Sequence, residues 1–181
     1  SAQKRIEDTT SEEFKNIMKF YLDMGIDGFR LDAVKYFYFN NNAKSIEFLS
    51  WINKTVKEMK PDAYIVGECF DGYELINQYY ESGIDSHFNF ATSVAYASQS
   101  GVINGTNPEG RGITAYYNSL ISNYNIGNGQ GIPAPFIDNH DMPRYTYQTN
   151  TEKNKFIFGL LGMMNGTIFS YYGDEVGLYG S

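Results

Sequence analysis

Apolar residues recur along the chain at two spacings, one typical of helices and one typical of short buried strands. The helical spacing covers residues 10–24, 43–60, 73–82 and 152–165, and the stretch 91–124 in two pieces around a loop at 101–112. Short apolar runs predict strands at 26–32, 63–66, 83–88 and 167–171, and a further strand that follows Pro133 and ends within 136–141. Strands that alternate with helices in this way predict a parallel sheet built from βαβ units.

Two local signals fix the predicted ends of the first helix. Thr10 and Glu13 have the spacing of a capping box, so we expect the helix to begin at Thr10. Gly25 follows the last apolar position of the helical pattern, and a glycine there is typical of a helix end.

Polar residues follow each predicted strand, and in parallel α/β proteins this edge of the sheet carries the chemistry. Five strands fit either a doubly wound open sheet or a piece of an eight-stranded barrel. No glycine-rich phosphate motif follows any strand, which disfavours nucleotide binding. A complete barrel takes about 250 residues, so a chain of 181 residues would hold only part of one.

Composition narrows the classes of function. The formal net charge is −7 and the sequence has no basic stripe, so we expect neither nucleic acid nor a membrane as partner. The single cysteine, Cys69, excludes an intrachain disulfide framework. Aromatic residues make up 17% of the chain and include sixteen tyrosines, which suit stacking on sugar rings, although an aromatic core explains many of them equally well.

Three carboxylates, Asp32, Glu68 and Asp141, stand at the ends of three separate predicted strands. Hydrolysis of a glycosidic bond with retention needs one carboxylate that attacks the sugar and a second that protonates the leaving oxygen. Glu68 lies among apolar residues, which suits an acid that must be neutral when it donates. Each carboxylate taken alone is better explained as a strand-end cap or a surface charge, but the three together favour a site.

Neighbouring residues suggest different roles for these carboxylates. Arg30 stands two residues before Asp32, so on a strand both side chains share a face and the guanidinium can hold the carboxylate ionised. This suits a nucleophile or an electrostatic stabiliser, with an ordinary strand-end ion pair as the alternative. Asn139 and His140 precede Asp141 and offer donors suited to sugar hydroxyls.

Four segments resemble signature segments of the α-amylase family of glycoside hydrolases, in the family's order. They are Gly28–Lys35, Val66–Glu68, Phe136–Asp141, and Gly166–Thr167 with Tyr171–Glu175. The resemblance covers essentially the whole chain. It implies a (β/α)8 TIM barrel, of which this α/β chain would hold approximately strands four to eight with their helices.

The resemblance also implies a retaining enzyme that cleaves α-1,4 bonds of starch-like α-glucans or maltooligosaccharides without an organic cofactor. Asp32 would be the nucleophile, Glu68 the general acid/base, and Asp141 the stabiliser that grips sugar hydroxyls. The residues expected to contact substrate are Arg30, Lys35, Tyr36, Asn139 and His140.

Tyr36 departs from the family pattern, in which many members carry histidine after the lysine. In those members this residue gives a backbone carbonyl to calcium and a side chain to the substrate. The carbonyl survives the change to tyrosine, so calcium is a candidate structural cofactor. No cluster of oxygen ligands is readable in the sequence, and the metal ligands stay unassigned.

By this resemblance, residues 1–181 form an incomplete catalytic barrel domain without the family's inserted loop domain or carboxyl-terminal β-domain. We therefore expect the chain to be a piece of a larger enzyme. Alone it would expose sheet edges and an apolar face. We expect it to be poorly stable alone, to pair with the missing half of its barrel or with copies of itself, and to hydrolyse little.

Related activities share the same carboxylates. A cyclodextrin-forming transglycosylase, an exo-acting α-glucosidase and an α-1,6-bond hydrolase stay open. A non-catalytic glucan-binding relative also stays open, although such a relative would be expected to have lost one or more of the carboxylates.

We expect an extracellular or cell-surface location, with the cytoplasm as the alternative. His87 is predicted to be a core or rim residue, and Arg144 either joins the charge network of the site or caps a loop.

Overall fold

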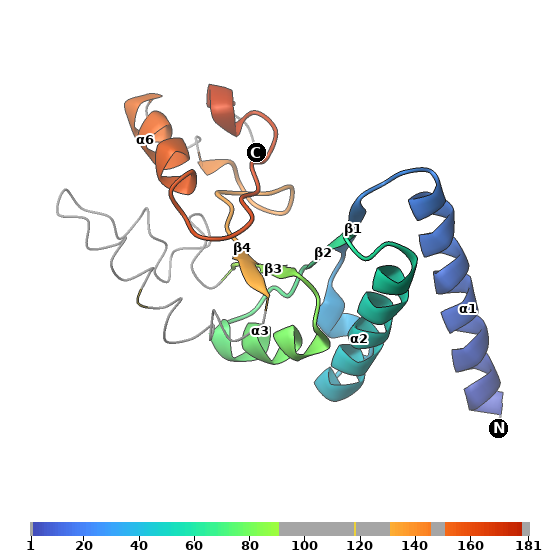
Figure 1. The fold of residues 1–181 in the computed structure, drawn as a ribbon. Coiled ribbons are helices and arrows are strands. Elements are labelled where there is room, and N and C mark those ends of the chain that lie inside the picture. Colours follow the sequence, from blue (N-terminus) through green and yellow to red (C-terminus); the bar gives the residue numbers. More distant parts are fainter. Residues whose placement is uncertain (1, 91–117, 119–130, 146–150, 179–181) are drawn as a thin grey trace.

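The structure, a computed structural model, describes residues 2–90, 118, 131–145 and 151–178 (Figure 1). Its α-helices are α1 (Ala2–Asp23), α2 (Asn42–Met59), α3 (Tyr73–Tyr79) and α6 (Thr151–Leu161). Its strands are β1 (Gly28–Leu31), β2 (Tyr64–Gly67), β3 (Ser86–Phe88) and β4 (Ile132–Ala134). Short 3₁₀ helices are η1 (Val34–Tyr36), η2 (Tyr80–Ser82) and η4 (Asp174–Val176). The helices and loop predicted between 91 and 124 lie outside the described residues.

The four strands form one parallel sheet in the order β1-β2-β3-β4. Strands that are consecutive among those described are therefore neighbours in the sheet, and helices connect β1 to β2 and β2 to β3. This is the arrangement that βαβ units produce. The predicted α/β class with a parallel sheet is confirmed.

The segment predicted as a strand at 167–171 forms an isolated bridge beside β4 instead of a strand. Phe169 pairs in parallel with Phe136. The backbone N–H groups of Thr167 and Phe169 donate to carbonyl oxygens of residues 133 and 135, at 3.0 and 2.9 Å. The chain therefore runs parallel to β4 here, but only one residue pair meets the geometry of a ladder.

Pro133 lies inside β4, so the prediction that it precedes the strand is wrong. The residues on either side of Pro133 form the hydrogen bonds to the ends of β3. Ile132 N donates to the Asp85 carbonyl at 2.9 Å, and the Ala134 carbonyl accepts from Asn89 N at 3.0 Å. Proline lacks an N–H, and the backbone of β4 uses the residues on either side for this contact. A proline is therefore tolerated in this strand.

Helix α1 begins at Ala2, so the prediction of a start at Thr10 is wrong. Thr10 lies inside the helix because the preceding residues 2–7 include good helix formers and extend the backbone hydrogen bonds toward the amino terminus. The predicted end is confirmed. Gly25 has a left-handed φ of 95°, and its N–H donates to the Leu22 carbonyl at 2.9 Å.

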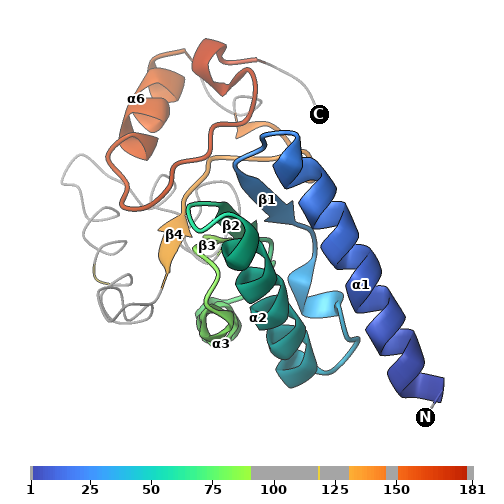
Figure 2. The same ribbon diagram turned by 45° about the vertical axis from the view of Figure 1, so that its right-hand side comes forward.

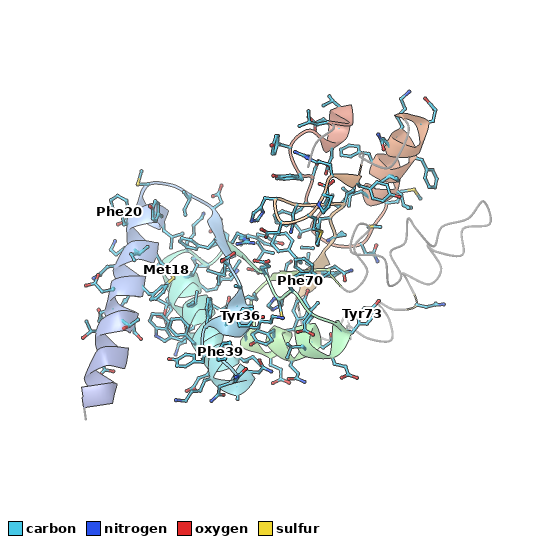
Figure 3. The ribbon with its side chains drawn as sticks, turned by 180° about the vertical axis from the view of Figure 1, so that it is seen from behind. Met18, Phe20, Tyr36, Phe39, Phe70 and Tyr73 are labelled. Carbon is cyan, nitrogen blue, oxygen red and sulfur yellow. The ribbon has the colours of Figure 1, made fainter. Side chains whose placement is uncertain are left out.

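The core is one cluster of buried residues, to which α2 and α6 contribute three side chains each and α3 contributes two. Helices α1 and α2 run side by side, and Met18 is the buried residue by which α1 joins the cluster (Figures 2 and 3). Much of the remaining apolar surface of α1 is exposed, including Phe14, Ile17, Phe20 and Tyr21, and so is Met24 directly after the helix.

His87 of β3 is fully buried, as predicted for a core residue, and packs edge-on against the ring of Tyr80 with the ring centroids 4.8 Å apart. Burial lowers the pKa of His87 to about 4, so its imidazole is neutral near pH 7. None of the helices in the described part of the chain is long and apolar enough to cross a membrane.

Candidate active site

The carboxyl ends of β1 and β2 bring the first two predicted carboxylates together. Leu31 pairs with Gly67 in the sheet, so Asp32 and Glu68 are the next residues on neighbouring strands. Two backbone hydrogen bonds extend the pairing: Glu68 N donates to the Leu31 carbonyl, and Val34 N donates to the Glu68 carbonyl, both at 2.9 Å. The sheet register therefore places the two residues side by side.

One guanidinium holds both carboxylates. Arg30 Nη1 pairs with Asp32 Oδ1, and Arg30 Nη2 lies 2.6 Å from Glu68 Oε2. The sequence predicted the first of these pairs but not the second. Arg30 is therefore shared between Asp32 and Glu68 and does not serve Asp32 alone.

The two carboxylates differ sharply in exposure. The side chain of Asp32 is 76% exposed, and that of Glu68 is 11% exposed. The Arg30 guanidinium, followed by a hydrogen bond with Glu68, holds the pKa of Asp32 below its ordinary value. Asp32 is thus an accessible, ionised carboxylate, and Glu68 is a largely buried one, as its apolar neighbours predicted.

The turn after β1 also contacts Glu68. Ala33 N donates to Glu68 Oε2 at 3.3 Å, and Ala33 adopts a left-handed backbone with φ 44° and ψ 47°. This conformation is unfavourable for a residue with a β-carbon. The local strain accompanies a backbone N–H that faces the buried carboxylate, and such strain is common at functional sites.

Asn139, His140 and Asp141 form a second part of the candidate site. Asp141 N donates to Asn139 Oδ1 at 2.9 Å, and His140 Nε2 lies 3.2 Å from Asp141 Oδ2. The side chains of His140 and Asp141 are each more than half exposed. The charge of His140 also contributes to the lowered pKa of Asp32, which places His140 within electrostatic reach of the first two carboxylates.

A cavity of about 160 Å³ joins these two parts. Arg30 lines it from β1, and Asn139 and His140 line it from the segment after β4. The other lining residues are Phe88, Phe136, Asp138, Phe169, Ser170 and Tyr171. The cavity gathers three of the predicted substrate-binding residues. The cavity is not lined by the three predicted catalytic carboxylates, Asp32, Glu68 and Asp141. They lie next to it, because they pair with Arg30 and His140, which do line it.

Lys35 and Tyr36 lie on η1 and are not among the residues that line the cavity. Lys35 Nζ donates to the Phe70 carbonyl at 2.6 Å and to Asp71 Oδ2 at 3.0 Å. The Tyr36 ring is exposed and stacks on Phe39, with the ring centroids 6.3 Å apart (Figure 3). Lys35 therefore ties the loop after β1 to the loop after β2, and Tyr36 presents a flat ring to solvent.

A buried charge network beside the cavity was missed by the sequence prediction. Arg144 Nη1 donates to Asp174 Oδ1 at 3.3 Å, and Asp138 Oδ2 accepts from Tyr145 N at 2.8 Å. All three charged side chains of the network are buried. Arg144 pairs with Asp174 and not, among the described residues, with Asp32, Glu68 or Asp141, so it holds the loop after β4 and does not join the predicted catalytic carboxylates. Asp138 and Asp174 lie inside the signature segments, but burial of a particular carboxylate is not readable from those segments.

A calcium site is not apparent from this part of the molecule. Within the described residues, no group of three or more His, Cys, Asp or Glu side chains is arranged to hold a metal ion. The residues present therefore do not make up a ligand set of their own, and the predicted contribution of the Tyr36 carbonyl would need oxygen ligands from elsewhere.

Comparisons with known proteins connect this geometry to a family. A family model for the catalytic domain of alpha-amylase matches residues 5–181. "Alpha-amylase 3" of Dictyoglomus thermophilum is 33% identical over 172 residues, which are 94% of this chain and 33% of that protein. A cyclomaltodextrin glucanotransferase of Niallia circulans is 29% identical over 182 residues, which are 96% of this chain and 23% of that protein.

Among solved structures, Amy13B of Eubacterium rectale is 38% identical to this chain and superposes with a TM-score of 0.82. The match covers 96% of this chain and 35% of Amy13B. The chain thus spans about a third or less of the length of these relatives, and its sheet corresponds to part of an amylase catalytic barrel. Together with the match to the family model over nearly all of its residues, this similarity shows that the chain belongs to the alpha-amylase family of glycoside hydrolases.

Proposed function

We propose that the protein containing this chain hydrolyses α-1,4 bonds of starch-like glucans by double displacement with retention. The observation that carries the proposal is the single guanidinium of Arg30, which binds one exposed and one buried carboxylate. Hydrolysis with retention needs two such groups in different environments, one ionised and one able to carry a proton.

The sharing of Arg30 also bears on stereochemistry. The two carboxyls of retaining glycosidases stand about 5–5.5 Å apart, against about 6.5–9.5 Å in inverting enzymes. One oxygen of Asp32 and one of Glu68 bind the two terminal nitrogens of the same guanidinium. Both carboxyls are thus held at one guanidinium, and this arrangement supports the shorter separation of a retaining enzyme as part of the proposal.

In the proposed reaction, Asp32 attacks the anomeric carbon while Glu68 protonates the departing glycosidic oxygen. The resulting glycosyl ester with Asp32 is then attacked by water, whose proton returns to Glu68. The lowered pKa of Asp32 keeps the nucleophile ionised. The Ala33 N–H and Arg30 hold Glu68 in place between the two steps.

The cavity is the proposed seat of the sugar ring under attack. Phe88, Phe136 and Phe169 supply apolar walls, and Asn139 and His140 supply polar groups for sugar hydroxyls. Asp141 beside His140 is the proposed stabiliser, and Lys35 with Tyr36 is the proposed contact on the leaving-group side.

We also propose that the described strands belong to strands four to eight of the barrel. Calcium stays a prediction.

Transglycosylation is the second candidate, because the chain matches a cyclomaltodextrin glucanotransferase over 96% of its length. Both activities share the glycosyl-enzyme intermediate and differ in whether water or a sugar hydroxyl accepts it. The carboxylate geometry is the same in either case, so the products distinguish them.

The test uses the full protein that contains this chain. It measures the release of reducing sugar from soluble starch and the length of the products. We expect short linear maltooligosaccharides, and a loss of about 10³-fold or more in Asp32→Asn. Asp62→Asn is the matched control, because Asp62 lies before β2, at the opposite end of that strand from Glu68, and pairs with Lys60 on the surface.

Cyclic products would favour the transglycosylase. A folded protein that binds starch without releasing product would favour a glucan-binding relative. Equal rates for Asp32→Asn and the parent would show that Asp32 is not the nucleophile.

A further inference from the structure

Two carboxyls and one guanidinium lie buried beside the cavity, outside the proposed catalytic set. Asp138, Arg144 and Asp174 are 1%, 7% and 6% exposed. Asp174 Oδ1 accepts from Arg144 at 3.3 Å, and Asp174 Oδ2 accepts from Tyr171 N at 3.0 Å. This group links the segment 138–145 to the segment 171–174.

The hydrogen bonding of this group is incomplete if both carboxyls are ionised. Asp138 Oδ2 accepts from Tyr145 N, but Asp138 Oδ1 is buried without a hydrogen-bond partner among the described residues. Two carboxylates and one guanidinium also leave one uncompensated negative charge, and an unpaired buried charge or acceptor is costly. A proton on Asp174 that is donated to Asp138 Oδ1 corrects both defects at once.

The electrostatics of Asp174 agree with such a proton. Burial, followed by the negative charge of Asp138, raises the pKa of Asp174 to about 7, although Arg144 acts in the opposite direction. Of the other titratable and charged groups nearby, Tyr171 and Tyr172 stack on the Arg144 guanidinium at 4.1 and 4.4 Å.

The remaining charged neighbours are accounted for. Arg30 and His140 line the same cavity as Asp138. Helix α6 packs against η4, and there Glu152 and Lys155 pair with each other on the exposed surface. These contacts supply no second buried cation to Asp138 and Asp174 within the described residues.

The position of the group connects it to the candidate site. Asp138 and Arg144 stand on either side of Asn139, His140 and Asp141. The Asp138–Tyr145 hydrogen bond closes this segment into a loop, and Arg144 fastens the loop to Asp174. Asp138, Asn139 and His140 all line the cavity, so a shift of the fastening would move groups that face the proposed substrate.

We propose that Asp138 and Asp174 share one buried proton and, with Arg144, act as positioning residues that hold the segment 139–141 in its working geometry. The positioning role rests on the proposed function, because it concerns residues that would contact the substrate. The shared proton does not, because it is inferred from the buried group itself. Loss of the proton at alkaline pH would leave two repelling carboxylates and loosen the loop.

The first test compares Asp174→Asn with Asp174→Ala, each against Asp62→Asn as an exposed carboxyl-to-amide control. An asparagine amide can donate to Asp138 Oδ1 as the shared proton does, with the loss of one of the two hydrogen bonds that the Asp174 oxygens accept, whereas alanine loses all of these contacts. We expect Asp174→Ala to lower kcat about thirtyfold or more and Asp174→Asn to lower it about threefold. We also expect Asp174→Asn to keep its kcat to higher pH than the parent and Asp62→Asn, whose kcat falls above about pH 7 as the pair loses its proton.

Equal losses in Asp174→Asn and Asp174→Ala, with no difference in the pH profile of kcat between Asp174→Asn and the parent, would overturn the positioning role. This comparison requires a measurable activity. The shared proton is therefore also tested through the stability of the fold.

That test is the dependence of unfolding on pH. The folded state binds the proton of Asp174 more tightly than the unfolded state, whose carboxyl has a pKa near 3.8. The free energy of unfolding therefore falls as pH rises from about 4 to about 7 and is no longer affected by this group at higher pH. Asp174→Asn has no such proton, so its urea midpoint should fall less than that of the parent over this range.

The same fall in the parent, in Asp174→Asn and in Asp62→Asn would overturn the shared proton. If the protein proves inactive on α-glucans, the urea comparison still decides whether the proton is shared. The failure of the proposed function and the failure of this inference are therefore distinguishable.

Discussion

Two groups of the same composition, one arginine and two carboxyls, lie at the carboxyl-terminal edge of this sheet and behave in opposite ways. In the open group, Arg30 binds Asp32 and Glu68, and the Asp32 side chain is 76% exposed. In the closed group, Arg144 binds Asp174, whose side chain is 2% exposed, with Asp138 beside it. The pKa of Asp32 is lowered, chiefly by its hydrogen bond to Arg30, and the pKa of Asp174 is raised, chiefly by burial.

The difference shows that burial, and not composition, decides the sign of such a shift. In the open group, water solvates the Asp32 carboxylate and the guanidinium adds a favourable charge, so the ionised form is favoured. In the closed group, lost hydration outweighs the single cation that serves two acids. The open group is therefore suited to chemistry that needs an ionised carboxylate, and the closed group is suited to holding a loop in place.

The largest expected effect is on stability, from Arg144→Met. Removal of the cation leaves the negative charge of the two buried carboxyls uncompensated, and breaking a buried pair in this way costs about 3–5 kcal/mol. The free energy of unfolding, measured with urea, should fall by that amount. Lys60→Met is the control, because Lys60 forms exposed ion pairs with Asp27 and Asp62 and should change stability by about 0.5 kcal/mol or less. A similar small change in Arg144→Met would mean that the closed group does not anchor the fold.

The next effect is on activity, from Arg30→Met. Loss of the shared cation misplaces both proposed catalytic carboxyls, and we expect kcat/KM to fall about a hundredfold. The loss of stability should be smaller than for Arg144→Met, because only Glu68 of the two carboxyls is buried, whereas water replaces the guanidinium at the exposed Asp32. If Arg30→Met loses more unfolding free energy than transition-state stabilisation, as calculated from kcat/KM, the difference in role between the two groups is contradicted.

The acid limb of the pH profile gives a separate measurement on Arg30→Met. Activity that requires ionised Asp32 is lost as pH falls through its lowered pKa, so the parent should stay active below the ordinary value near 3.8. Without Arg30 the limb of kcat/KM should move to higher pH. The part of the stability that this ion pair contributes is present above about pH 4 and is lost as pH falls in the same way. An unchanged limb would show that Arg30 does not set the ionisation of Asp32.

The smallest effect is expected from Lys35→Met. Lys35 fastens the loop after β1 to the loop after β2 through Phe70 and Asp71, at the edge of the open group. Loss of these charge-assisted bonds should raise KM for maltooligosaccharides by about threefold to tenfold with little change in kcat. A fall in kcat as large as that of Arg30→Met would place Lys35 in the chemical step.

The sequence predicted much of the fold because the local signals agreed with the tertiary structure. Helix α2 follows the apolar spacing from Ile46 to Met59, Asn41 caps it by accepting from Lys44 N, and Gly25 ends α1. The predictions at Thr10 and Pro133 failed for a shared reason. Both relied on one residue as a boundary, and backbone hydrogen bonding with neighbouring residues continued the element through it.

For the candidate site, the residues and their order along the chain were readable from the sequence, and so was the alternation that brings Asp32 and Glu68 to one edge. The roles assigned to those residues remain predictions. Only the tertiary structure decided that Arg30 serves two carboxyls, that the Tyr36 ring faces solvent on Phe39, and that Asp138 and Asp174 share a buried environment with Arg144. The physical reason is that hydrophobic spacing and turn residues act over a few neighbours along the chain. The Arg30–Glu68 and Arg144–Asp174 ion pairs and the burial of these groups depend on distances between segments thirty or more residues apart, and these exist only once the sheet has formed.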